Sequence, residues 1–442
     1  MFKKIFYPLS ILLLISSCTE KSKLTGQTEI TKWKDGKLGA VSITYDDGIR
    51  TQFSEVLPIM DKLQLPATFF VITGPIKESN YPAKFVGRPV KEIINETAHI
   101  ATNAENFFER ASAIRYSGFK GMQAYYDKAD EMYELGKKEN AYKEIDTSYG
   151  KVRSGKLIPG KDTSMEIANE TGLSWDDLKQ YASHGYEIAS HTVTHAHLAI
   201  MDTANMLYEL QKSRQDIMDH LGPQYTFSAE VPFGIDDPRV MKTALPIYPS
   251  LRNLMPEPYM KEINRGDNTQ PVTADKEYVQ WQRGPLSKTT LAKMESWIDT
   301  TLAHNNIWLV LVFHGIDSVG WEPLPHELLD TYFKFIKKNE HDLWVATFGD
   351  VGRYMRERMD AKVTSKLDGD SISVSLIRSL DKSVYNIPLT LKTYVPSQWG
   401  KVSVTQSDKI SEATPEKDEK GTYVLYPAYP DSDTIVLMKE KS

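Results

Sequence analysis

The stretch Ser42-Ile43-Thr44-Tyr45-Asp46-Asp47-Gly48 contains the end of a short strand. The residue pattern predicts that this strand is buried and covers residues 40–44. The glycine lets the chain turn sharply as it leaves the strand. Two adjacent carboxylates at a strand end are costly unless a positive group lies beside them. A metal ion is the usual partner, because divalent cations accept carboxylate oxygen. Taken alone, the stretch also fits a plain polar turn.

The residues that follow predict a β-α-β unit. Apolar residues at helical spacing predict a helix from Phe53 to Leu63, which Pro66 ends. The continuous apolar run at 67–72 is typical of a parallel strand buried on both faces. Residues from about 75 to 172 are polar and mostly helical in pattern, and we interpret them as an insertion near the mouth of the sheet.

A second strand end carries two histidines. Ser174 is expected to cap a helix that runs to about 183, and a strand is expected over 186–190. It leads into His191-Thr192-Val193-Thr194-His195, in which two imidazoles can converge on one ion if the loop coils back. Solvent-facing loop histidines are the alternative. His197 is expected to be exposed or to lie behind the ligands.

Together these motifs resemble those of the NodB-homology polysaccharide deacetylases, carbohydrate esterase family four. Residues 44–48 resemble the family's Thr-Phe-Asp-Asp-Gly, and residues 185–195 resemble its second motif. The resemblance covers roughly 38–359 without the insertion. It implies a distorted (β/α) barrel of about seven strands, with a divalent metal at the C-terminal mouth of the strands. It further implies Asp46 as general base, and as metal ligands Asp47, His191 and His195.

The family's third and fourth motifs are altered in this chain. Residues 230–234 stand where the family has Arg-x-Pro-Tyr-Gly, so the backbone N–H of Phe233 is expected to face the oxyanion. Glu230 replaces the arginine that contacts the base, and a second carboxylate would raise the pKa of Asp46 unless a cation intervenes. Trp281 stands in the nearest match to the family's Asp-Trp motif. Arg283, close behind it, is expected to pair with Asp46 instead.

A third strand-end signal is His314, which follows the apolar run 307–313. The pair His314-Gly315 resembles the end of the family's Leu-x-His motif, with Val312 in place of the leucine. A lone histidine after an apolar strand is more often structural. Three such signals in one barrel favour catalysis, and the resemblance implies that His314 protonates the leaving group.

The first residues carry a different signal. Lys3 and Lys4 precede an apolar segment at 5–15 that is too short to span a membrane, and Cys18 follows two serines. This resembles the bacterial lipoprotein box, so we expect a signal peptide at 1–17, a lipid on Cys18 and a polar tether at 18–37. An ordinary cleaved signal peptide is the alternative. The expected location is the cell envelope, periplasmic or at the cell surface, with a lipid anchor in a membrane.

Composition and the C-terminal region complete the expectations. The 442 residues are 40% hydrophobic and 25% charged, and the net charge of −6 without a basic stripe argues against nucleic acid as partner. The single cysteine excludes a disulfide framework. Residues 362–442 alternate with period two between turn signals, which predicts a small antiparallel β domain. This domain either binds carbohydrate or packs on the barrel, with packing as the default.

The predicted function is metal-dependent hydrolysis of N- or O-linked acetyl groups on a polysaccharide or oligosaccharide. The resemblance implies zinc first, with Co²⁺ or Ni²⁺ as alternatives. An acetylated glycan is then the expected substrate. The other interpretation is a non-hydrolytic, glycan-binding envelope lipoprotein on a degenerate deacetylase fold, which the changes at Glu230 and Gln280 favour. Asp46 and His314 speak against it, because a protein that only binds needs neither.

Overall fold

The computed structural model describes residues 24–169, 172–234, 237–252, 261–263, 271 and 277–440. The chain divides into two compact units. The barrel unit is Leu38–Gly352, and the β unit combines the chain up to Lys37 with Arg353–Ser442. The predicted signal peptide and Cys18 lie outside the described residues. Among the helices that are described, none is both long and apolar enough to cross a membrane.

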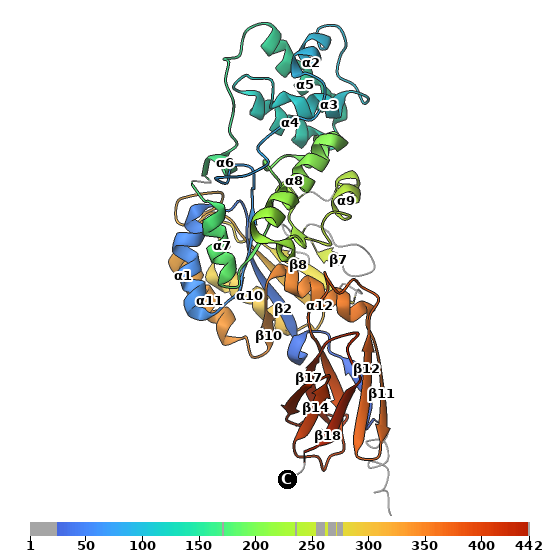
Figure 1. Ribbon diagram of the computed structural model, residues 1–442. Helices are drawn as coiled ribbons and strands as arrows, with labels where there is room; N and C mark the ends of the chain where they lie inside the picture. Colours follow the sequence, from blue (N-terminus) through green and yellow to red (C-terminus); the bar gives the residue numbers. More distant parts are fainter. Residues whose placement is uncertain are drawn as a thin grey trace, which may run out of the picture. The chain divides into compact units, whose positions relative to one another are not determined.

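The barrel unit is built on a curled parallel sheet (Figure 1). In the described part of the chain the strand order is β6-β5-β4-β3-β2-β9-β8-β7, and β10 also pairs with β2. The bounds are β2 Gly39–Tyr45, β3 Thr68–Val71, β4 Glu187–Ser190, β5 Ser228–Ala229, β6 Ser250–Leu251, β7 Lys261–Ile263, β8 Val279–Arg283, β9 Ile307–Phe313 and β10 Leu343–Val345. This is the predicted distorted (β/α) barrel.

The two central strands explain the continuous apolar runs in the sequence. Every residue of β2 and of β9 is buried, and the two strands pair in register from Ala40 with Trp308 to Tyr45 with Phe313. A parallel strand with helices on its outer side and the core on its inner side meets no solvent on either face. The C-terminal ends of β2 and β9 therefore lie side by side, which brings Asp46 next to His314.

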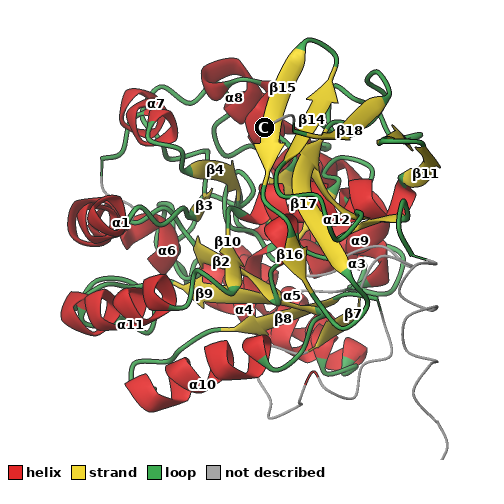
Figure 2. Cartoon of the chain, turned by 90° about the horizontal axis from the view of Figure 1, so that it is seen from below, coloured by secondary structure: helices red, strands yellow, loops and turns green. Residues whose placement is uncertain are grey.

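Helices surround the sheet on its outer side (Figure 2). They are α1 Leu57–Leu63, α7 Trp175–Ser183, α8 Thr203–Leu221, α9 Pro238–Ala244, α10 Leu291–Leu302 and α11 His326–Lys338. The expected cap of α7 is present as a full capping box between Ser174 and Asp177. The helix predicted from Phe53 differs at its start, because a π-helical turn, Gln52–Val56, precedes α1. Such turns are common beside functional sites.

The insertion is a cluster of helices at one end of the barrel unit (Figure 1). Its main helices are α2 Val90–Glu96, α3 Phe107–Ile114, α4 Met122–Glu134 and α5 Lys138–Arg153, with the short α6 Met165–Asn169 on the way back. They share an apolar core of their own, in which Tyr126, Tyr142 and Tyr149 are buried. These tyrosines therefore pack between helices and are not free to stack on a sugar.

The β unit contains two antiparallel sheets, of four and five strands in the described residues. Its strands are β1 Thr28–Ile30, β11 Lys362–Asp368, β12 Ser371–Ile377, β13 Leu389–Tyr394, β14 Val402–Gln406, β15 Lys409–Ala413, β16 Glu416–Lys417, β17 Thr422–Ala428 and β18 Ile435–Lys439. The predicted alternation is confirmed, since buried and less buried residues alternate along β12 and β17. The helix α12, Phe348–Asp360, precedes β11.

One boundary prediction is wrong. The segment 18–37 was expected to be a polar tether, but Thr28–Ile30 forms β1, which pairs antiparallel with β13. Trp33 is fully buried, and Gly26 N–H donates to the carbonyl of Tyr394. The physical reason is that β13 would otherwise be an edge strand with unpaired backbone N–H and C=O groups. The three residues of β1 pair with these groups. At least residues 26–33 are therefore part of the β unit.

Candidate metal centre

The candidate centre is formed by three buried side chains at the C-terminal ends of β2 and β4. The Nε2 atoms of His191 and His195 lie 3.6 and 3.5 Å from Oδ1 of Asp47. Two ligands of one tetrahedral ion, each about 2.1 Å from it, lie about 3.4 Å apart. The three side chains are at most 7% exposed as residues, and Oδ1 of Asp47 has no hydrogen-bond donor in the described part of the chain. This spacing and this orphaned oxygen fit a divalent cation.

The electrostatics of the three groups also fit a cation. Burial raises the pKa of Asp47 to about 7, so a carboxylate here is unfavourable without a positive partner. Burial lowers the pKa of His191 and, more strongly, that of His195. Both imidazoles are therefore neutral near pH 7, which is the form that binds a metal. Nδ1 of His191 lies 3.1 Å from the carbonyl oxygen of Glu230, a contact that leaves Nε2 free for the ion.

The loop that carries the two histidines is held by one buried carboxylate. Glu209 of α8 accepts hydrogen bonds from the N–H groups of Val193 and Thr194, at 2.9 and 2.8 Å, and from the Thr194 hydroxyl at 2.7 Å. These bonds coil the loop back so that His195 returns to the same point as His191. The loop therefore coils back as the convergence of the two histidines on one ion requires. No pattern in the sequence indicated this role for Glu209.

Strained backbone concentrates at this centre. Asp47, Thr192, His195 and Phe233 all have positive φ, between 52° and 74°, although none is glycine. Such conformations cost of order 1 kcal/mol or more each and persist only where surrounding contacts fix them. The strain indicates that side-chain direction at these positions is constrained more tightly than local backbone preference allows.

Asp46 lies beside the triad and is held by a guanidinium. Nη1 and Nη2 of Arg252 donate to its two carboxylate oxygens at 2.6 and 2.5 Å. Nε2 of His314 is 3.2 Å from Oδ2 of the same carboxylate. Burial alone would raise the pKa of Asp46, but Arg252 and His314 outweigh burial and hold the pKa well below its usual range. Asp46 is therefore ionised at neutral pH.

Arg252 corrects the prediction for Arg283. The cation that pairs with Asp46 follows β6, and Arg252 Nη2 is also 3.0 Å from Oε1 of Glu230. Because the guanidinium contacts both carboxylates, the pKa of Asp46 is lowered overall in spite of Glu230. Arg283 instead packs over the ring of Trp281 at 4.5 Å. Trp281 itself belongs to the apolar core of the barrel.

The side chain of Gln52 joins the two strand ends. Its Nε2 donates to the carbonyl oxygens of Asp46, at 2.6 Å, and of His314, at 2.9 Å. The π-helical turn that begins at Gln52 directs this side chain inward. The pKa of His314 is lowered by burial but raised further by Asp46, with a net upward shift. A protonated His314 beside an ionised Asp46 gives the site an acid and a base in contact.

Phe233 and His197 form the side of the site that faces the insertion. The ring of Phe233 is stacked on His197, with centroids 3.7 Å apart, and meets His195 edge-on at 4.7 Å. His197 is buried, so the expectation of an exposed histidine is wrong. Its Nδ1 atom lies 2.7 Å from Oδ2 of Asp130 on α4. The insertion therefore contacts the segment that follows the ligand loop. In the first turn of α6, Oε2 of Glu166 is 3.9 Å from Nδ1 of His195.

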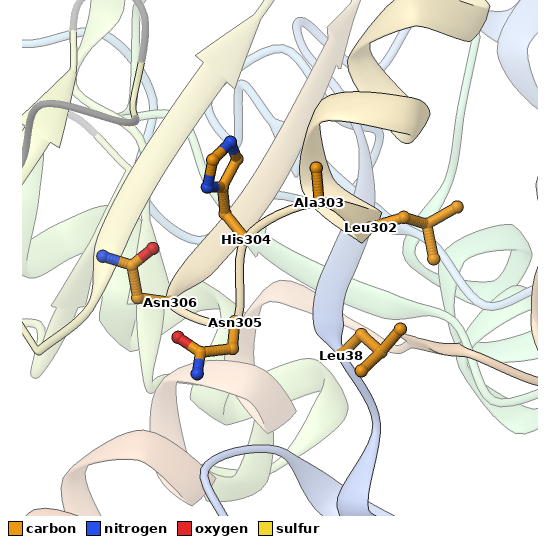
Figure 3. Close-up of a pocket in the computed structure, with 6 residues that line it drawn as sticks. All are labelled: Leu38, Leu302, Ala303, His304, Asn305 and Asn306. Carbon is orange, nitrogen blue, oxygen red and sulfur yellow. The ribbon is translucent and has the colours of Figure 1, made fainter.

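One pocket and a second group of potential metal ligands lie outside this site. A pocket of about 420 Å³ is lined by Leu38, Leu302, Ala303, His304, Asn305 and Asn306 (Figure 3). Leu38 precedes β2 and Asn306 precedes β9, so this pocket lies at the opposite end of the strands. A second group of potential ligands, Glu55, Asp317 and His326, is largely exposed, and Asp317 already accepts from His326 at 3.1 Å.

Comparison with known proteins agrees with this architecture. The polysaccharide deacetylase family model matches residues 34–106 and 147–245, which contain Asp46, Asp47, His191 and His195. The barrel unit is thus a distorted (β/α) barrel whose sequence is similar to the polysaccharide deacetylase family over these two segments. A curated relative, a gellan lyase of Bacillus sp., is 24% identical over 319 residues, which cover 63% of this chain and 12% of the relative. The chain thus spans about an eighth of that protein's length.

Solved structures are similar at low identity. A putative polysaccharide deacetylase of Mycobacterium smegmatis is 13% identical, with a TM-score of 0.39, and the match covers 76% of this chain and 96% of the other. A family 4 carbohydrate esterase of Bacillus subtilis is 14% identical, with a TM-score of 0.30, and the match covers 75% and 87%. At these scores the fold assignment rests on the strand order and the family-model match.

Proposed function

We propose that this chain is a metal-dependent deacetylase that hydrolyses N- or O-linked acetyl groups on a polysaccharide or oligosaccharide. The observation that carries the proposal is that a candidate metal triad and a candidate acid–base pair lie side by side in one site. A buried Asp-His-His triad, spaced for one cation, lies beside a carboxylate and an imidazole that contact each other at 3.2 Å. Binding alone would need only the triad.

Asp47, His191 and His195 would hold the cation, with zinc as the first candidate and Co²⁺ or Ni²⁺ as alternatives. When bound, the cation supplies Lewis-acid polarisation of the acetyl carbonyl. Asp46, kept ionised by Arg252, accepts the proton of the attacking water. The backbone N–H of Phe233 donates to the oxygen that gains charge. His314 gives a proton to the nitrogen or oxygen that stays on the sugar as its bond to the acetyl carbon breaks.

The substrate class and the location belong to the same proposal. The matched family model and the names of the similar proteins support an acetylated glycan. The sequence pattern around Cys18 supports a lipid anchor in an envelope membrane, periplasmic or at the cell surface, after removal of residues 1–17. An envelope glycan or an external polysaccharide would be within reach of a protein anchored in this way.

One assay tests the proposed activity. Acetate release is measured from acetylated xylan, chitooligosaccharide and peptidoglycan, before and after treatment with a chelator and after the metal is restored. We expect release from at least one glycan, its loss on chelation and its recovery with Zn²⁺, Co²⁺ or Ni²⁺. Glycan binding without acetate release from any substrate would favour the non-hydrolytic alternative. The pattern of substrates would also decide between ester and amide hydrolysis.

A further inference from the structure

Two aromatic side chains at the site are exposed although the carboxylates beside them are buried. Phe233 is 49% exposed and Trp321 is 44% exposed, whereas Asp46 and Asp47 are each 2% exposed. Trp321 is the one on the side of His314, and its ring meets that imidazole edge-on, with centroids 4.7 Å apart. Leaving an indole partly in water beside a catalytic group forgoes part of the stabilisation that its full burial would give. An exposed aromatic ring in this position is what a ligand with an apolar face would cover.

The loop that presents Trp321 is closed on itself. Gly315 N–H donates to the carbonyl of Trp321 at 2.9 Å, and Leu324 N–H donates to the carbonyl of Gly315 at 3.1 Å. Gly320 has φ of +91°, and a Cβ there would lie 2.8 Å from Cα of Gly315. Only glycine fits that close approach. The backbone that carries the indole is therefore fixed before any ligand arrives, which reduces the entropy lost on binding.

A second exposed apolar residue lies on a segment tied to this loop. The carboxylate of Glu322 accepts from the backbone N–H of Ser287 at 2.7 Å and from its hydroxyl. Leu286, the preceding residue, is 49% exposed. The bond fixes the segment after β8 to the loop after β9, at the residue that follows Trp321. The segment that carries Leu286 is therefore tied to the loop that carries the indole.

We propose that Trp321, with Leu286 at its side, is the platform on which the pyranose ring that bears the acetyl group stacks. This inference rests on the proposed function and adds the position of the sugar ring in the site. In deacetylation the leaving atom stays on the sugar, so the group that His314 protonates is a sugar atom. The acetyl group lies toward Asp47 and Phe233, and the sugar must lie toward His314, where the indole is. The apolar C–H face of a pyranose matches an indole face.

The test compares glycan with a sugarless acetyl ester. The ratio of kcat/KM for an acetylated oligosaccharide to kcat/KM for an aryl acetate is measured in wild type, Trp321→Ala and Trp321→Phe. We expect this ratio to fall about tenfold or more in Trp321→Ala, mainly through KM for the glycan, and to stay within about threefold of wild type in Trp321→Phe. Tyr429→Ala, which removes a 46% exposed ring from the β unit, is the matched control and should leave the ratio unchanged.

A binding arm separates this inference from the proposed function. Kd for the same oligosaccharide is measured by calorimetry on the metal-loaded Asp46→Asn protein, with and without Trp321→Ala. We expect Kd to rise about tenfold when the indole is removed, about 1.4 kcal/mol. An unchanged Kd and an unchanged ratio would overturn the platform even if the chain is an active deacetylase. A raised Kd would support it even if no acetate is released.

Discussion

Arg252 is the residue on which the chemistry of Asp46 depends most directly. It separates two buried carboxylates, Asp46 and Glu230, and donates to both oxygens of Asp46. We expect Arg252→Gln to lower kcat/KM by about 10²-fold or more, because an uncompensated pair of carboxylates would take up a proton and remove the base. Steady-state kinetics on the glycan that gives acetate release measures this effect.

The control for that prediction changes the arginine expected from sequence. Arg283→Gln should cost less than Arg252→Gln, since the guanidinium of Arg283 lies over Trp281. If Arg283→Gln is the more damaging of the two, the pairing assigned to Arg252 does not govern the base. Glu230→Gln should retain most activity, because Arg252 would keep its two bonds to Asp46.

Asp46 and His314 are predicted to act in turnover and not in holding the ion. Asp46→Asn and His314→Ala should each lose about 10²–10⁴-fold in kcat, the usual contribution of a general acid or base. Both variants should bind metal as wild type does, because the three proposed ligands are untouched. Metal analysis alongside kinetics checks the two parts together. A near-normal kcat in either variant contradicts the role given to that residue.

Helix α4 supports the active site through His197. Asp130 is buried, and its Oδ2 atom lies 2.7 Å from Nδ1 of His197. The ring of His197 stacks on the ring of Phe233. Because Phe233 has φ of +62°, it stays in place only while these contacts hold it. We expect Asp130→Asn to lower kcat about tenfold with little change in KM. Asp127 on the same helix also contacts His197, with Oδ1 3.1 Å from Nε2, but it is half-exposed, so Asp127→Asn should have the smaller effect. An unchanged kcat in Asp130→Asn would argue against the support.

The insertion has an acid-sensitive link between α2 and α3. Glu96 lies 2.5 Å from Arg88 and 2.9 Å from Arg110, and these hydrogen bonds lower its pKa from 4.5 to about 2. A carboxyl whose pKa is lowered by folding stabilises the fold fully above about pH 4.5. That contribution is lost as the pH falls toward 2.

The expected outcome is a stability difference that depends on pH. Glu96→Gln should lower the thermal midpoint at pH 7, and the difference from wild type should shrink between pH 4.5 and 2.5. The exposed Glu92→Gln on the same helix serves as control and should show little effect at any pH. A difference between Glu96→Gln and wild type that is the same at pH 7 and 2.5 would exclude the charge as its source.

The elements that sequence predicted well are those with a strong local pattern. The strand β9 is a continuous apolar run, β3 lies in another at 67–72, β2 and β4 each lead into a recognisable motif, and α7 carries its own capping signal. The elements that were missed depend on distant partners. The strand β1 finds β13 about 365 residues away, and no short pattern in Thr28–Ile30 announces that pairing.

The candidate site divides in the same way. Asp46, Asp47, His191, His195 and His314 each follow a recognisable strand, so their meeting at one sheet edge could be predicted. Arg252 could not be, because it follows a strand of two residues and lies 206 positions from the carboxylate it holds. Gln52 and Glu209 act through single side-chain bonds to backbone, for which the sequence has no signal beyond residue type.

The whole molecule combines a barrel that carries the site, an insertion that contacts the loop after the ligands, and a β unit built from both ends of the described chain. Every proposed catalytic or ligand residue lies in the barrel unit. We therefore expect changes on the exposed surface of the β unit, such as Tyr429→Ala, to leave acetate release from a short oligosaccharide unaffected. A loss of release in that variant would place a required glycan contact outside the barrel.

The central claim is that Asp47, His191 and His195 together hold a metal on which hydrolysis depends. The direct measurement is metal content per chain together with acetate release for Asp47→Ala, His191→Ala and His195→Ala, with His326→Ala from the exposed second cluster as control. We expect about one metal per chain and full activity in the control, and loss of both metal and activity in the other three variants. The assigned metal site is wrong if all three variants retain one metal per chain, or if they release acetate at the wild-type rate without it.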